Sequence, residues 1–253
     1  MRPVEVAGSN QPKAATSTRA VILAGGLGTR MRPITETIPK PMIMVAGKPF
    51  LQHQLGLLSR AGIEEALLLV AYLGEQIQEY FGDGAKFGCK VSYSFEPSPL
   101  GTGGALKNAE AQLQDQFVVV NGDTYLAIDY CALVEEFAET NCSALIAAYE
   151  KPATISQEIP ASILPNNLGV GGDGLVTEYR KRNPEGLSHI DAGVIVLKKE
   201  ILAGLPAGQK CSLEEEIYPN LIARGEMRAW VTREPFYDMG SPAGLAALEE
   251  KLK

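Results

Sequence analysis

Hydrophobic residues in the first half of the chain form short runs, separated by stretches with helical spacing. Three continuous aliphatic runs and one alternating run predict strands over residues 20–23, 67–71, 117–120 and 91–95. Between these runs, apolar spacing predicts a helix over 74–81 and an alanine-rich stretch predicts another over 104–113. The alternation of strands and helices predicts an α/β fold with a mostly parallel sheet and helices on both faces.

The second half of the chain is less regular. Prolines, asparagines and glycines crowd residues 150–175, which predicts loops around short strands. An apolar run predicts a strand over 194–197, and residues 213–223 have a helical pattern. Ser241 followed by Pro242 predicts the N-cap and first turn of a last helix. We therefore expect a smaller α+β part in this half.

A glycine-rich segment directly follows the first predicted strand. Three glycines within residues 25–28 allow a sharp turn and expose backbone N–H groups that suit phosphate oxygens. Arg30 follows at once, and Lys40 stands between two prolines. The Gly-Asp pair at 122–123 also follows a predicted strand, and ligands of open α/β sheets bind at the carboxyl ends of strands. The two segments should therefore share one edge, which predicts a site for a polyphosphate.

Two common nucleotide-binding motifs do not fit this segment. A Walker A loop requires Gly-Lys followed by Ser or Thr, but Gly47-Lys48 is followed by Pro49. The dinucleotide fingerprint requires a third glycine, and Met31 occupies that position when the motif starts at Gly26. An NAD-dependent oxidoreductase is therefore disfavoured.

Composition and charge exclude other classes. The 253 residues are 45% hydrophobic, which is enough for one sizeable core. The net charge of −7 without a basic tract argues against nucleic-acid binding, and the chain contains no apolar stretch long enough to span a membrane. The four cysteines lack metal-site spacing and are expected to be buried thiols. Residues 1–18 lack the apolar core of a secretory signal, so we expect a flexible leader and a cytoplasmic protein.

Several segments together resemble the sugar-1-phosphate nucleotidyltransferases, also called NDP-sugar pyrophosphorylases. In chain order they are GGLGTRMRPITETIPKP, AGKPFLQHQLGLLSRAGI, YLGEQIQEYFGDG, PLGTGGALKNA, VVNGDTY, HIDAGVIVL and FYDMGSPAGL. PLGTGGA and HIDAG look most like the bacterial branch that includes heptose-1-phosphate guanylyltransferases. The resemblance implies a Rossmann-like fold in a single domain over 19–253, with its nucleotide-binding part at about 19–125 and its sugar-binding part at about 126–253.

The resemblance also implies the reaction: an NTP and a sugar 1-phosphate give an NDP-sugar and pyrophosphate. The pair that we favour is GTP with D-glycero-D-manno-heptose 1-phosphate, for surface polysaccharide precursors. Because the attacking phosphate oxygen is already ionised, the protein needs to supply positioning and positive charge rather than a nucleophile. The alternatives are UTP or dTTP with a hexose or N-acetylmuramate 1-phosphate, and a non-catalytic homologue that binds NDP-sugars. A homo-oligomer is also compatible with the sequence.

The resemblance assigns the nucleotide to the glycine-rich loop and to a second loop at 101–104. The predicted nucleotide ligands are Ala24, Gly25, Gly26, Gly28, Thr29, Arg30, Gly101, Thr102, Gly103 and Gly122. Arg30 would hold the β- and γ-phosphates, and Lys40 would neutralise the α-phosphate or the sugar phosphate. Arg32 is not included in this set, because the sequence supports a solvated surface charge there as well as it supports a phosphate ligand.

The remaining predicted site residues are acidic or lie near the sugar. Asp123 is a predicted Mg²⁺ ligand because a hard cation prefers carboxylate and phosphate oxygens, and the resemblance adds Asp238 as the second ligand. The resemblance assigns Glu178, Lys181 and Asp191 to the sugar, with Lys181 on its phosphate and Arg182 as the alternative. Asp191 stands where many relatives have Asn, which changes the hydrogen bonds offered to sugar hydroxyls. Glu214, Glu215 and Glu216 are expected to form a solvated first helical turn.

Overall fold

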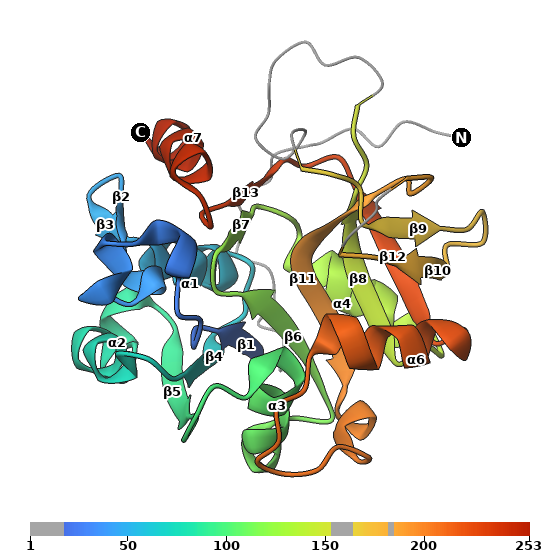
Figure 1. Ribbon diagram of the computed structural model, residues 1–253, viewed down its shortest axis with the longest axis horizontal. Helices are drawn as coiled ribbons and strands as arrows, with labels where there is room; N and C mark the ends of the chain where they lie inside the picture. The colour runs from blue at the N-terminus through green and yellow to red at the C-terminus, as the bar shows by residue number, and fades with distance from the viewer. Residues whose placement is uncertain (1–17, 153–163, 182–184) are drawn as a thin grey trace.

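The computed structural model describes residues 18–152, 164–181 and 185–253. A seven-stranded sheet runs through it in the order β12-β8-β11-β6-β1-β4-β5 (Figure 1). In chain order, these strands are β1 (Ala20–Leu23), β4 (Glu65–Val70), β5 (Lys90–Phe95), β6 (Gln116–Asn121), β8 (Ala144–Tyr149), β11 (Ile190–Lys198) and β12 (Met227–Thr232). All neighbouring pairs are parallel except those of β11, which is antiparallel to both β6 and β8. The mostly parallel sheet is confirmed.

Helices cover both faces of the sheet because successive strand residues point to opposite sides. Ala20 and Ile22 of β1 belong to one core cluster, and Val21 belongs to another. Side chains from α1, α2 and α4 complete the first cluster, and those of α3 and α6 complete the second. These helices are α1 (Phe50–Arg60), α2 (Gly74–Phe81), α3 (Gly101–Asn108), α4 (Tyr130–Glu139) and α6 (Tyr218–Ala223).

Two predicted helices differ from their expected form. The helix expected over 104–113 is α3, which begins at Gly101, so the expected loop at 101–104 is its first turn. The segment 213–223 is divided into a π-helical turn (Leu213–Ile217) and α6. The expectations from sequence include neither α1 nor α4, although Leu51, Leu55 and Leu58 of α1 have helical spacing and are buried.

Smaller elements join the sheet to its edges. The short hairpins and paired strands are β2 (Met44–Val45) with β3 (Lys48–Pro49), β7 (Thr124–Leu126) with β13 (Phe236–Asp238), and β9 (Leu168–Val170) with β10 (Val176–Tyr179). Short 3₁₀ helices span Thr29–Met31, Ile34–Glu36, Lys40–Met42, Ala85–Phe87, Glu110–Gln112 and Lys199–Leu202. The last helix, α7 (Pro242–Leu252), begins after Ser241, whose Oγ accepts the N–H of Gly244 at 3.1 Å as the sequence predicts.

A third cluster of buried side chains holds the segments around the glycine-rich loop. Its members are Met31, Ile43, Val45, Phe50, Tyr125, Tyr237, Met239 and Leu248, which join this loop region to β7, β13 and α7. Among the described residues, no helix combines the length and the apolar character needed to cross a membrane. All four cysteines are free thiols, and Cys89, Cys131 and Cys211 are buried.

Candidate active site

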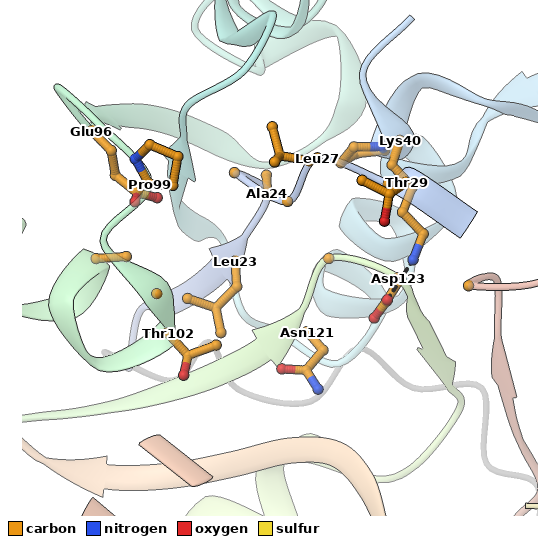
Figure 2. Close-up of a pocket in the computed structure, with 18 of the residues that line it drawn as sticks. Leu23, Ala24, Leu27, Thr29, Lys40, Glu96, Pro99, Thr102, Asn121 and Asp123 are labelled. Carbon is orange, nitrogen blue, oxygen red and sulfur yellow. Dashed lines mark hydrogen bonds and ion pairs between the residues drawn. The ribbon is translucent and has the colours of Figure 1, made fainter. Parts of the chain in front are cut away.

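A pocket of about 470 Å³ opens where β1 and β6 end, between the glycine-rich loop and the first turn of α3 (Figure 2). Most of the predicted nucleotide and phosphate ligands line it. They are Ala24, Gly25, Gly26, Gly28, Thr29, Arg30, Lys40, Gly101, Thr102, Gly122 and Asp123. The predicted residues outside its lining are Gly103, Glu178, Lys181, Asp191 and Asp238.

The glycine-rich loop presents backbone N–H groups to this pocket. The N–H groups of residues 25–28 donate to no acceptor within the part of the chain that the structure describes. Gly28 has a φ of 60°, and its carbonyl oxygen accepts the Thr35 hydroxyl at 2.8 Å, which fixes the turn. Unpaired N–H groups in such a turn form a cradle for anions.

Close approach of two strand ends brings Asp123 to the same loop. The N–H of Gly122 donates to the carbonyl oxygen of Leu23 at 3.1 Å. A Cβ at position 122 would lie 2.2 Å from that oxygen, so a larger residue would force the strand ends apart. Gly122 therefore places the acidic side chain after β6 beside the phosphate cradle after β1.

The predicted charged residues converge on one place. Lys40 is buried and donates its Nζ to Oδ2 of Asp123 at 2.5 Å (Figure 2). Burial raises the pKa of Asp238, the negative charge of Asp123 adds to the rise, and the charges of Lys40 and Arg30 oppose it. A Cβ at Gly240 would lie 2.6 Å from Nη2 of Arg30 and 2.7 Å from Oδ1 of Asp238. Two cations and two carboxylates thus lie together at one edge of the sheet.

Pairing of β13 with β7 positions Asp238. Asp238 lies opposite Thr124 in this antiparallel pair, and the N–H of Met239 donates to the carbonyl oxygen of Asp123 at 2.9 Å. Oδ1 of Asp238 accepts the N–H of Gly240 at 2.6 Å, which orients the carboxylate. The described residues contain no group of three or more histidine, cysteine, aspartate or glutamate side chains able to hold a metal ion. A cation held by the two aspartates would therefore require oxygen ligands from substrate or water.

The sequence profile of the nucleotidyl transferase family matches residues 19–155. The chain belongs to this family. A mannose-1-phosphate guanylyltransferase of Mycobacterium tuberculosis is 33% identical over 88% of this chain, and a UTP–glucose-1-phosphate uridylyltransferase of Synechocystis is 34% identical over 82%. The chain spans only 61% and 56% of the length of these two relatives.

Two further similar proteins match over nearly their whole length. A D-glycero-alpha-D-manno-heptose 1-phosphate guanylyltransferase of Campylobacter jejuni is 34% identical over 88% of this chain and 95% of its own. The crystal structure of HddC from Yersinia pseudotuberculosis, solved in complex with GMP-PN, has a TM-score of 0.79 and 31% identity. That match covers 93% of this chain and all of the HddC chain.

One predicted nucleotide ligand, Gly103, packs closely within the protein. The N–H of Gly103 donates to the carbonyl oxygen of Cys211 at 2.9 Å, so this group is used within the protein. A Cβ at Gly103 would lie 3.0 Å from Cys211 Sγ and from Ile217 Cδ1. The close packing of α3 therefore accounts for glycine at position 103, and its contact with a nucleotide stays a prediction.

The predicted sugar ligands Glu178 and Asp191 lie on β10 and β11 and Lys181 lies just after β10, all apart from the pocket lining. Glu178 is exposed and accepts from Nη2 of Arg180 at 2.9 Å. Asp191 accepts the N–H of Gly193 at 2.8 Å and the Tyr179 hydroxyl at 3.2 Å. Burial raises the pKa of Asp191 to about 6, although the hydrogen bond from the N–H of Gly193 lowers it in part. Arg182, the alternative to Lys181, lies outside the described residues.

Four polar residues that were not predicted from the sequence also line the pocket, namely Glu96, Asn121, Lys210 and Glu214. Glu96 follows β5, and its Oε2 accepts the N–H of Leu100 at 2.9 Å. A Cβ at Gly25 would lie 2.6 Å from Oε1 of Glu96, so this carboxylate lies against the glycine-rich loop. Its position directly after a parallel strand is the signal that could have identified it.

The expectation of a solvated turn at Glu214 is wrong. Its side chain is only 14% exposed, whereas that of Glu215 is 67% exposed. Burial alone would raise the pKa of Glu214, but hydrogen bonds from Ser212 and Thr102 and the charge of Lys181 together hold it below its ordinary value. Glu214 is therefore a fixed carboxylate in the pocket wall.

Proposed function

We propose that this chain transfers a nucleotidyl group from an NTP to a sugar 1-phosphate, giving an NDP-sugar and pyrophosphate. The observation that carries the proposal is the convergence of Arg30, Lys40, Asp123 and Asp238 beside an N–H-lined loop. Both reactants are strongly anionic, so the reaction requires cations and backbone donors around the phosphates more than it requires a nucleophilic side chain.

In the proposed step, an oxygen of the sugar phosphate attacks the α-phosphorus of the NTP. One P–O bond forms as the bond to pyrophosphate breaks, and the leaving pyrophosphate takes the electron pair. Arg30, at the exposed side of the loop, neutralises the β- and γ-phosphates. Lys40, held by Asp123, offsets charge at the α-phosphate or the sugar phosphate. The loop N–H groups hold the nucleotide in line for the attack.

We also propose Mg²⁺ as the cofactor. The donor set suits this ion, because Asp123 and Asp238 are close enough for the charge of Asp123 to raise the pKa of Asp238. Bound there with phosphate oxygens, Mg²⁺ would supply positive charge to the phosphates. The protein's own contribution is to hold the two carboxylates side by side through the contact of Met239 with Asp123.

Glu96 favours guanine as the base. Its carboxylate lies across the pocket from the Lys40–Asp123 pair, against Gly25 (Figure 2). Guanine presents adjacent N1–H and N2–H₂ donors, which a carboxylate can accept together, whereas uracil and thymine present one N–H between two carbonyl oxygens. The carbonyl oxygens of uracil or thymine would repel a facing carboxylate and donate no hydrogen bond to it. This lowers the affinity for UTP and dTTP.

The substrate pair that we favour is GTP with D-glycero-D-manno-heptose 1-phosphate, in the cytoplasm, for a surface polysaccharide precursor. The relative named for this pair matches over nearly its whole length, which supports the choice. Relatives named for mannose 1-phosphate with guanylyl transfer and glucose 1-phosphate with uridylyl transfer keep UTP or dTTP with a hexose or N-acetylmuramate 1-phosphate as the alternative. The complete charged set argues against a non-catalytic NDP-sugar-binding homologue.

The test is pyrophosphate release with Mg²⁺, crossing five NTPs with a panel of hexose, N-acetylmuramate and heptose 1-phosphates. We expect release with GTP and the heptose 1-phosphate. Glu96→Gln should lower kcat/KM for GTP by about tenfold or more, because the amide offers guanine only one acceptor oxygen, and it should raise kcat/KM for UTP, because the charge that repels the uracil carbonyl oxygens is gone. Detectable NTP binding without release for any pair would favour the non-catalytic homologue.

A further inference from the structure

A series of side-chain contacts joins the first turn of α3 to Lys181. Thr102 Oγ1 donates to Oε2 of Glu214 at 2.9 Å and accepts the N–H of Leu213 at 2.8 Å. Ser212 Oγ donates to the same carboxylate oxygen at 2.7 Å. The Thr102 hydroxyl proton is therefore committed to Glu214, so this side chain holds the segment 212–214.

Glu214 is anchored where Glu215 is not. Glu214 lines the pocket, and two hydroxyl groups fix its Oε2 at the start of the π-helical turn. Single π-helical turns are rare and are frequently found at functional sites. Glu215 has a largely exposed side chain, so water competes for its carboxylate.

Both carboxylates reach the ammonium of Lys181. Its Nζ lies 3.6 Å from Oε2 of Glu214 and 3.6 Å from Oε1 of Glu215. The Lys181 side chain is 46% exposed and has a long flexible stem, so its direction depends on what holds its end. Of the two partners, only Glu214 is itself immobilised and in the pocket wall.

We infer that Glu214, anchored by Thr102 and Ser212, is a positioning residue that holds the Lys181 ammonium beside the pocket for the phosphate of the sugar 1-phosphate. This inference rests on the proposed function. It adds a role for Glu214, and it adds a role for Thr102 beside its predicted contact with the nucleotide. Because Glu214 acts through Lys181, its loss should weaken binding of the sugar 1-phosphate and leave NTP binding unchanged.

The test compares Glu214→Gln with Glu215→Gln, which removes the other carboxylate at the same distance from Lys181. Glu214→Gln should raise KM for the sugar 1-phosphate about tenfold with little change in KM for the NTP, and Glu215→Gln should raise it by less than about twofold. Thr102→Val keeps the carboxylate but removes one anchor, so it should raise the same KM by about threefold. It also replaces Glu214→Gln if that variant does not fold.

A double-mutant cycle with Lys181→Met isolates the mechanism. With Lys181 replaced, Glu214→Gln should change KM for the sugar 1-phosphate by less than about twofold. An equally large effect with and without Lys181 would overturn the inference, and so would equal effects of Glu214→Gln and Glu215→Gln. Calorimetric binding of mannose 1-phosphate gives the same comparison without turnover. If the wild-type protein binds mannose 1-phosphate but releases no pyrophosphate, the proposed function is contradicted. The affinities of Glu214→Gln and Glu215→Gln for mannose 1-phosphate then still decide the role of Glu214.

Discussion

Replacing Asp123 by Asn tests the centre of the proposed site. The substitution keeps the shape of the side chain and an acceptor oxygen for Lys40, but it removes the negative charge that pairs with the ammonium. It also removes one of the two carboxylates proposed to hold Mg²⁺. Stability and turnover should therefore respond to very different extents.

The structure sets the expected loss of stability. The Lys40 side chain is 11% exposed and that of Asp123 is 30% exposed, so the pair is only partly desolvated. Removing the charge from such a hydrogen-bonded pair should cost about 1–2 kcal/mol, below the cost for a fully buried pair. For a chain of this size, that lowers Tm by about 2–8 °C and leaves the fold intact.

Turnover should fall far more. Loss of a group that stabilises charge on the reacting phosphates should lower kcat by at least about 100-fold. The assay is pyrophosphate release at saturating NTP, sugar 1-phosphate and Mg²⁺, together with thermal unfolding monitored by circular dichroism.

A matched control separates the two effects. Lys107 and Glu110 form a pair at 2.6 Å with side-chain exposures of 13% and 32%, nearly the values of the Lys40–Asp123 pair. Neither residue lines the pocket. Glu110→Gln should lower Tm by a comparable few degrees at most and leave kcat unchanged. Near-normal turnover of Asp123→Asn at saturating Mg²⁺ would refute the assignment of Asp123 to the metal and phosphate site.

Three further predictions address other parts of the site. Arg30→Ala should lower kcat/KM by about 100-fold with an unchanged Tm, since the side chain is exposed; an unchanged kcat/KM would make it an ordinary surface charge. Gly25→Ala places a Cβ 2.6 Å from Oε1 of Glu96, so nucleotide titration should show affinity reduced by about fivefold or more in a folded protein; unaltered affinity would exclude this contact. The pKa of Asp191 is raised from its ordinary value of 3.8 to about 6, so between pH 3.8 and 6 the folded protein binds a proton that the unfolded chain does not. The contribution of Asp191 to the free energy of unfolding therefore decreases by up to about 3 kcal/mol as pH rises through this window. Asp191→Asn should lack that decrease in thermal melts between pH 4 and 8, and an identical pH profile would contradict the raised pKa.

The parts of the site that follow from topology could be predicted from the sequence. The aliphatic runs over 20–23 and 117–120 predict strands of one mostly parallel sheet, so their carboxyl ends lie at one edge; the structure pairs these strands directly. Arg30 and Asp123 follow those ends closely, so their meeting needs no knowledge of side-chain packing. Asp238 is different, because it reaches Asp123 only through the pairing of β13 with β7, and no pattern in these short segments indicates that pairing.

Side-chain orientation within a charged run could not be predicted. Glu214, Glu215 and Glu216 have the same charge, and all suit the start of a helix. Their difference arises from the π-helical turn and from the Thr102 hydroxyl, which come from different parts of the chain. The burial of Glu214 is thus a property of tertiary contacts, and a sequence window around it contains no signal for it.

Glycine motifs have the same ambiguity, because a ligand close to the backbone and another part of the protein close to the backbone both leave no room for a Cβ. At Gly25 and Gly28 the requirement is local to the pocket, where the loop must pass Glu96 and adopt a positive φ. At Gly104 a Cβ would lie 2.6 Å from the carbonyl oxygen of Gln209, so α3 needs glycine there to pack against the chain before the π-helical turn. The GTGG segment therefore combines pocket-lining and packing glycines, and only the neighbours of each position distinguish them.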